Sequence, residues 1–228
     1  MPRARKPTRA ELAREQMYRD LVLECAERVF ARRGVHAAKM QDIAAEAGIS
    51  LSTLYGVFEG KSDVVDALHA WRGEQFLERV ARALDAPGPA REVVWHAIRA
   101  YCAFLLEHLD YFWVDLREGR SWAIGDVESN PEFQKALPKW RDALARGAAE
   151  GAFRADSPDK LATVVNGLLQ VCFAAALRDA ADVDALDPDA VAREIAECVE
   201  RLVCTPAALA APGPWLADAR AAAAAGGA

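Results

Sequence analysis

Apolar residues recur at three- and four-residue spacing along most of the chain, a pattern that predicts helices. The first stripe comprises Val22, Ala26, Val29 and Phe30 and ends at Gly34. No segment bounded by turn residues alternates between apolar and polar residues at every position, as a strand would. We therefore expect an all-α protein. Similar stripes predict further helices over residues 40–47, 51–57, 62–84, 90–109, 131–148, 158–180 and 187–204.

Prolines and glycines mark where these helices end. Asp85-Ala-Pro-Gly-Pro stops the helix that begins near residue 62, and Asn130 with Pro131 suits a helix start. Pro138 lies inside the stretch 131–148, so a kink or a break is expected there. Beyond Thr205 the chain is mostly Ala, Pro and Gly, and residues 206–228 are expected to be disordered, with Trp215 as the one large side chain that could dock.

Charge is distributed unevenly along the 228 residues, although the net value is only −6. Residues 1–61 hold 11 Lys and Arg against 8 Asp and Glu, a net +3, whereas the remainder holds 17 against 26, a net −9. A basic head on an acidic body suits a DNA-binding protein, because only the head should attract phosphate. On charge alone, a solvated charged tail explains the N-terminus equally well.

Cysteine usage and hydropathy bear on the compartment. The five cysteines are widely spaced and contain no C-x-x-C, which argues against a disulfide framework or a zinc site and fits a reducing cytoplasm. The longest uncharged stretch, residues 161–177, is seventeen residues long, short of the roughly 20 that span a bilayer. We expect a cytoplasmic protein with a buried helix at this position, no membrane contact, and neither metal nor cofactor.

Residues 34–61 carry the pattern with the clearest chemistry. Met40, Ile43 and Ala44 form one face of a helix of barely two turns, Gly48 suits a tight left-handed turn, and Ser50 can cap a second short helix. Two short helices joined by a glycine turn predict a helix-turn-helix, whose second helix enters the major groove of DNA. A generic helical hairpin is the alternative.

The segment from Val22 to about Leu68 resembles the DNA-binding domain of the tetracycline-repressor (TetR) family. D-I-A-A-E-A-G-I-S at 42–50, T-L-Y at 53–55 and F-E-G-K at 58–61 carry the resemblance. It implies an N-terminal three-helix helix-turn-helix domain followed by a C-terminal helical bundle for ligand binding and dimerisation. The expected parts are a basic flexible arm at 1–15, the helix-turn-helix domain at 16–61, the bundle at 62–205 and the tail at 206–228.

The resemblance also implies a set of DNA contacts. Ser52 and Thr53 would reach bases or phosphates, and Lys61 would grip a phosphate. The full expected set is Lys39, Gln41, Ser50, Leu51, Ser52, Thr53, Tyr55, Gly56 and Lys61. Two departures from the family matter. Ala38 and Lys39 stand where the family usually has a capping Thr or Ser, and the lost cap costs about 1 kcal/mol of local helix stability. Gly56 stands where a bulky residue is common, so the operator sequence of a relative cannot be transferred to this protein.

Aromatic residues beyond Lys61 suggest an apolar ligand pocket between helices, although they would fill a packed core equally well. Asn166 and Gln170 would need hydrogen-bond partners if buried, either from a ligand or from the same helix of a second subunit. The expected ligand-binding residues are Trp95, Tyr101, Phe104, Trp113, Trp122, Trp140, Asn166 and Gln170.

The histidines form no H-E-x-x-H pattern and no nucleophile–base arrangement, so no catalytic residue is expected. The sequence thus predicts a homodimeric, sequence-specific transcriptional regulator. We expect a repressor that a small hydrophobic effector releases from a palindromic operator. Two alternatives are a regulator whose bundle binds a protein partner and no small ligand, and a helical enzyme with a vestigial DNA head.

Overall fold

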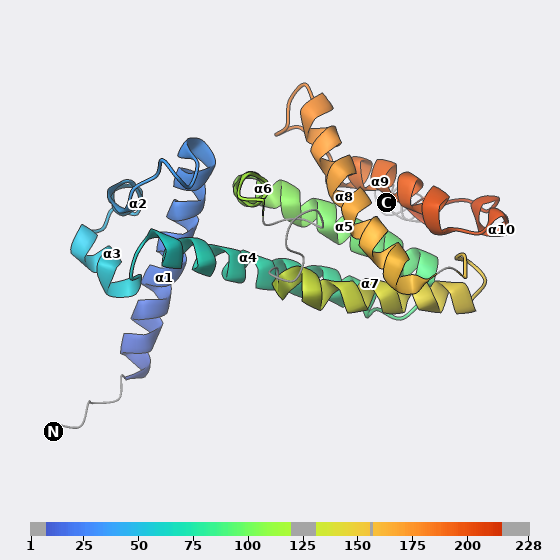
Figure 1. The fold of residues 1–228 in the computed structure, drawn as a ribbon, viewed down its shortest axis with the longest axis horizontal. Coiled ribbons are helices and arrows are strands. Elements are labelled where there is room, and N and C mark those ends of the chain that lie inside the picture. The colour runs from blue at the N-terminus through green and yellow to red at the C-terminus, as the bar shows by residue number, and fades with distance from the viewer. Residues whose placement is uncertain (1–7, 120–130, 156, 216–228) are drawn as a thin grey trace, which may run out of the picture. The chain divides into compact units, whose positions relative to one another are not determined.

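A computed structural model of the chain describes residues 8–119, 131–155 and 157–215. These residues form helices without any strand, apart from one isolated bridge between Phe153 and Cys204, which confirms the all-α class (Figure 1). The helices are α1 (Arg9–Arg33), α2 (Met40–Glu46), α3 (Leu51–Val57), α4 (Lys61–Leu84), α5 (Ala90–Glu107), α6 (Leu109–Arg117), α7 (Pro131–Ala149), α8 (Pro158–Asp179), α9 (Pro188–Val203) and α10 (Pro206–Leu209).

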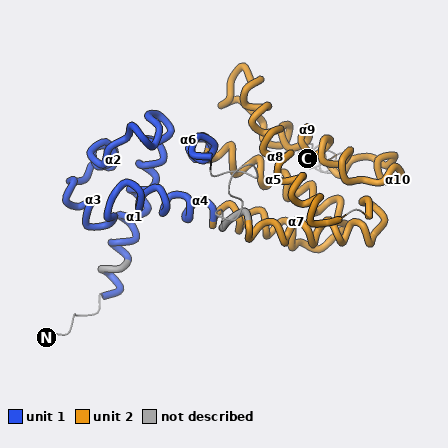
Figure 2. Tube along the Cα trace, in the orientation of Figure 1, with its two compact units in different colours: residues 1–73, 109–120 blue, residues 74–108, 121–228 orange. Residues whose placement is uncertain are grey.

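The chain divides into two compact units (Figure 2). Unit 1 comprises Met1–Gly73 and Leu109–Arg120, and unit 2 comprises Glu74–His108 and Ser121–Ala228. The boundary between these compact units falls inside α4, and unit 1 also includes α6. The functional division between residues 61 and 62 stays a prediction.

Unit 1 is built around the apolar stripe of α1. Phe30 of α1, Ile43 of α2 and Leu54 of α3 are fully buried together with Leu68 of α4. Val114 of α6 joins the same cluster and is 1% exposed. Helices α2, α3 and α6 thus lie against α1, and Leu68 of α4 completes the apolar core of the unit.

Unit 2 is a helical bundle in which α5 lies against α7 and α9, and α8 lies against α7 and α9. By length and composition α8 is apolar enough to cross a membrane. One such helix among the described residues is weak evidence for a membrane span. Val165, Leu169 and Phe173 of α8 are completely buried in the bundle, as expected for a core helix. The packing around residue 147 of α7 requires glycine, because a Cβ at Gly147 would lie 2.0 Å from the Phe153 ring.

Several expectations differ from the structure. The helix expected over 90–109 is α5, which ends at Glu107 because His108 leaves helical geometry with φ −129° and ψ 49°. The next helix, α6, was not expected. No break occurs at Pro138, which α7 passes through; Pro138 is exposed, so water can satisfy the carbonyl that loses its partner. Asn130 lies outside the described residues.

The two ends of the chain also contain more structure than expected. The helix α1 begins at Arg9, within the range assigned to a flexible arm. Beyond residue 205, α10 forms, and Trp215 is 9% exposed with its ring 5.8 Å from that of Trp95. The arm residues Arg3, Arg5 and Lys6 lie outside the described residues, as does the chain after Trp215.

Candidate nucleic-acid interface

The turn between α2 and α3 has the geometry that its glycine predicts. Gly48 adopts φ +65°, a left-handed conformation that costs glycine little. The backbone N–H of Ile49 donates to the Ala44 carbonyl at 3.0 Å, and that of Gly48 donates to Ala45 at 3.2 Å. These two bonds satisfy carbonyls at the end of α2 and hold the chain in a sharp turn before α3.

The start of α3 is fixed by Ser50. Its hydroxyl accepts a hydrogen bond from the backbone N–H of Thr53 at 3.0 Å and lies 2.8 Å from the hydroxyls of both Ser52 and Thr53. The sequence-based prediction of a Ser50 cap is therefore confirmed. Three hydroxyls thus cluster at the first turn of α3, where a recognition helix meets base edges and phosphates.

The two sides of α3 differ sharply in burial. Leu54 is fully buried, and Phe58, which follows the helix, is 1% exposed. On the other side Ser52 and Gly56 are exposed, and Tyr55 is 50% exposed. The apolar side chains anchor α3 to unit 1, so the hydroxyls and the phenol are presented outward on a fixed support.

The missing Thr or Ser cap of α2 is replaced from within the helix. The Asp42 carboxylate accepts a hydrogen bond from the backbone N–H of Lys39 at 2.9 Å. A lysine side chain has no acceptor, so the cap comes from Asp42 alone. The side chains of Lys39 and Gln41 are exposed at this end of α2, and a phosphate contact from Lys39 is compatible with its position.

Lys61 serves a purpose that the sequence did not reveal. Its ammonium donates to the carbonyls of Val35 at 2.7 Å, His36 at 2.9 Å and Ala38 at 3.0 Å. An ammonium has three N–H donors, and all three are used here. Lys61 therefore holds the loop between α1 and α2 in place, and in this geometry it has no donor left for the phosphate that the resemblance implied.

Much of the basic charge on α1 is paired with α2. Arg28 and Arg32 both contact the Glu46 carboxylate, at 3.1 and 2.5 Å, and Arg33 contacts Asp42 at 2.8 Å. The hydrogen bonds from Arg32 and Arg28 hold the pKa of Glu46 below its usual range. These arginines hold α2 against α1, so the number of Lys and Arg residues in 1–61 overstates how many cations are free to contact DNA.

A buried polar cluster joins α1, α4 and α6 within unit 1. Arg72 donates to Glu27 at 2.7 Å, and both side chains are at least 90% buried. His69 Nδ1 lies 3.4 Å from Asp115, and Arg117 donates to the Ala31 carbonyl at 2.6 Å. Burial raises the pKa of Glu27, and the Arg72 hydrogen bond opposes that rise. Sequence reasoning missed this cluster, and its only signal was Glu27 beside the apolar stripe of α1.

Comparison with known proteins gives this geometry a family. Residues 22–68 match the sequence model described as bacterial regulatory proteins of the tetR family. These residues include α2, the Gly48 turn and α3. Residues 22–68 therefore form a DNA-binding domain of the TetR family. The chain is a DNA-binding transcription regulator, as the sequence predicted.

Relatives extend the likeness of this regulator beyond its helix-turn-helix. It is 28% identical over 145 residues to the transcriptional repressor KstR2 of Mycolicibacterium smegmatis, covering 60% of this chain and 68% of KstR2. The Bacillus subtilis fatty acid metabolism regulator is 30% identical over 71 residues, or 31% of this chain and 37% of that protein.

Solved structures share the fold. The Mycobacterium tuberculosis ketosteroid regulator KstR2 superposes with a TM-score of 0.63 at 24% identity, covering 82% of this chain and 95% of that one. Bacillus subtilis FadR in complex with stearoyl-CoA gives 0.67 at 20% identity, covering 79% and 96%.

The residues expected to line one ligand pocket are dispersed in this regulator. Trp113 belongs to α6 in unit 1, and Trp122 lies outside the described residues. Asn166 is half-buried and donates to the Ala162 carbonyl of its own helix at 2.9 Å. Buried in unit 2 are Trp95, Tyr101, Phe104, Trp140 and Gln170.

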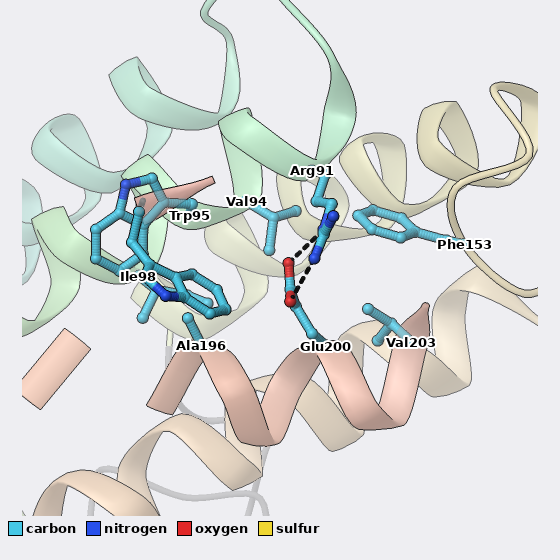
Figure 3. A pocket seen from close by; sticks show the side chains of 9 residues that line it. Arg91, Val94, Trp95, Ile98, Phe153, Ala196, Glu200 and Val203 are labelled. Carbon is cyan, nitrogen blue, oxygen red and sulfur yellow. Dashed lines mark hydrogen bonds and ion pairs between the residues drawn. The ribbon is translucent and has the colours of Figure 1, made fainter. Parts of the chain in front are cut away.

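These buried aromatic rings pack mainly on other rings. Phe76 of α4 lies 5.5 Å from Tyr101 and 5.4 Å from Phe104, and Phe173 of α8 lies 6.0 Å from Tyr101, centroid to centroid. Of the eight expected residues, only Trp95 lines the pocket between α5 and α9 (Figure 3). The other buried rings of the set do not line that pocket.

Proposed function

We propose that this regulator is a homodimeric repressor that reads a palindromic operator through the exposed face of α3. The observation that carries the proposal is the two-sidedness of α3, with Leu54 buried and Ser52 and Tyr55 exposed beside a capped first turn. Lys39 and Gln41 extend the same set of exposed polar residues onto α2. Two copies of this face require an operator of two half-sites about one helical turn, roughly 34–36 Å, apart.

The second copy would dock on α8. Val164 and Val171 of α8 are 51% and 59% exposed, although they lie on a helix that is apolar enough to cross a membrane by composition. Leu168 and Ala175 continue the same stripe at helical spacing and are half-buried. An exposed apolar stripe on a helix fits the same stripe of a second subunit across a two-fold axis. The two amides once considered for this interface, Asn166 and Gln170, lie away from the stripe.

A small hydrophobic effector would release the operator. Two relatives support this class of ligand by their names: a ketosteroid transcriptional regulator, and a FadR solved with stearoyl-CoA. Unit 2 of this chain is rich in buried aromatic rings, which suits such compounds. A hundredfold loss of operator affinity would need a coupling of about 2.7 kcal/mol between the two sites.

One observation favours a different trigger. The pocket between α5 and α9 leaves a free volume of about 10 Å³, which is room for one water molecule. A bundle packed this tightly could respond to a protein partner on its surface in place of a small ligand. Catalysis has less support, because burial raises the pKa of the Cys102 thiol to about 12 and of Cys204 to about 11, far from nucleophilic values.

Selection of binding sites from random DNA tests the proposal. The wild-type chain should enrich a palindrome, and Ser52→Ala should change base preference at one or two positions per half-site, at about 1–3 kcal/mol each. Ser62→Ala is the matched control, since Ser62 is an exposed serine on α4 outside the first turn of α3. Enrichment of a non-palindromic sequence, or no enrichment, would refute the proposal. An unchanged motif for Ser52→Ala would remove Ser52 from base recognition.

A further inference from the structure

The segment that follows α9, residues 206–215, is mostly exposed; we call it the C-terminal strap. Among its ten residues Trp215 alone is buried, and α10 exposes Leu209 to 40%. Thr205, just before the strap, is fixed by its backbone N–H, which donates to the Ala152 carbonyl at 2.9 Å. The strap beyond Thr205 is therefore anchored by its one buried side chain, Trp215, and by hydrogen bonds from Arg91 to the carbonyls of Ala211 and Pro212.

That ring occupies a groove with two helical walls (Figure 3). Val94, Trp95 and Ile98 of α5 form one wall, and Ala196 and Val203 of α9 form the other, with Phe153 at one end. The Trp215 ring meets the Trp95 ring edge-on at 5.8 Å between centroids. With Trp215 in place, only about 10 Å³ of the groove is empty. Trp215 itself lines this remaining volume, so removal of its ring would open an apolar space of about the size of an indole.

Arg91 supplies the polar end of the groove. Its guanidinium donates to both carboxylate oxygens of Glu200, at 2.5 and 2.8 Å, and its Nη1 also donates to the Pro212 carbonyl at 3.0 Å. A longer contact reaches the Ala211 carbonyl at 3.4 Å. Glu200 already neutralises the charge of Arg91, so the remaining N–H suits an uncharged acceptor. A carboxylate in the same place would be repelled by Glu200.

Gly213 allows the strap to fold back over the groove. A Cβ at residue 213 would lie 2.3 Å from the ring atom Cζ2 of Trp215, far inside van der Waals contact. Any larger residue at 213 must displace the indole. The strap can thus be released by a change that leaves every wall residue of the groove intact.

We propose that the groove between α5 and α9 is a binding site for uncharged compounds that join an aromatic ring to a carbonyl group, and that Trp215 occupies it as a displaceable internal competitor. The ligand ring would take the place of the indole between Trp95 and Ala196. Its carbonyl oxygen would replace that of Pro212 on Arg91 Nη1. The inference concerns binding to unit 2 only and does not depend on DNA recognition.

Calorimetric titration of the full chain with indole-3-carboxamide tests this site. Gly213→Ala and Trp215→Ala should each bind the compound at least tenfold more tightly than the wild type, because both remove the competitor. Gly60→Ala is the matched control, because a Cβ at Gly60 meets no atom within 4 Å, and it should bind as the wild type does. Circular dichroism confirms that each variant keeps its helical content.

Two results would overturn the inference. If neither variant binds more tightly than the wild type, Trp215 is no competitor and the groove is no ligand site. If Gly213→Ala binds tightly but keeps its affinity when Ala196→Trp fills the groove, the compound sits elsewhere. Indole-3-carboxylate should bind more weakly than the carboxamide, and equal or tighter binding would refute the role assigned to Arg91 and Glu200.

Discussion

Lys39 and Lys61 are the two lysines of the helix-turn-helix, and the structure gives them different surroundings. Lys39 is exposed at the start of α2, with its backbone N–H bonded to Asp42. Lys61 has its ammonium bonded to three carbonyls of the α1–α2 loop. The family resemblance assigned both to DNA, because a lysine in a sequence shows its charge and not its partners.

Salt dependence separates the two lysines. Lys39→Ala should flatten the slope of log K against log salt by about two per dimer, at roughly 0.9 per phosphate and one phosphate in each subunit. Lys61→Met should leave that slope unchanged but destabilise the chain by about 1–3 kcal/mol, because three carbonyls lose a charged donor. Operator titrations at several salt concentrations and thermal unfolding measure the two effects. If Lys61→Met flattened the slope as much as Lys39→Ala does, Lys61 would have to contact a DNA phosphate.

At the scale of elements, most helix limits were visible in the sequence. Gly34, Gly48, Pro158 and Pro188 mark helix ends locally, so α1, α2, α8 and α9 begin or end within one or two residues of expectation. The short helix α6 was missed, because the sequence pattern was followed only to residue 109, where α6 begins.

Contacts distant in sequence were also beyond prediction. Arg72 and Glu27 are 45 residues apart, and nothing in either local pattern indicates that they pair. The exposed face of α3 was predicted correctly because its periodicity is local. The groove between α5 and α9 was not predicted, because its walls bring together two distant helices and a strap that the composition suggested was disordered.

The buried pair of Glu27 and Arg72 gives α1 and α4 a pH response. Burial raises the pKa of Glu27 in the folded chain, so the folded state binds this proton more tightly than the unfolded state does. Relative to Glu27→Gln, the wild type should therefore lose stability as the pH rises from the ordinary value of 4.5 through the raised pKa. Urea unfolding of both proteins between about pH 3.5 and 7 measures the difference.

Glu46 serves as a control, because its contribution to stability should change with pH in the opposite direction to that of Glu27. The pKa of Glu46 is lowered by Arg32 and Arg28, so the folded state holds its proton less tightly. Relative to Glu46→Gln, the wild type should lose stability as the pH falls from 4.5 through the lowered pKa. Curves of the same sign for Glu27→Gln and Glu46→Gln would contradict the assignment of burial as the dominant influence on Glu27.

At the scale of the whole molecule, the proposed dimer requires that the exposed apolar stripe of α8 be buried between the two subunits. Val171 is 59% exposed in the single chain, so Val171→Arg should leave the fold intact. In the dimer the same arginine would be an unpaired buried charge, at a cost on the order of 3–5 kcal/mol. Analytical ultracentrifugation should show a monomer with weak operator binding. Ala145→Arg, at an exposed position of α7, should remain dimeric, and a tight Val171→Arg dimer would mean that another face is used.

The chain leaves unit 1 within α4 and comes back to it with α6, which restricts how chimeras of this regulator can be built. Helix α6 is coloured with the helix-turn-helix as part of unit 1 (Figure 2). Val114 belongs to the core of that unit, and Arg117 donates a hydrogen bond to the Ala31 carbonyl near the end of α1. A chimera that joins residues 1–73 of this chain to the remainder of a relative would set its α1 against a foreign α6. Operator specificity is therefore transplanted intact only when two separate stretches, 1–73 and 109–120, travel together. A single crossover within α4 leaves a hybrid core that must be repacked before it can read DNA.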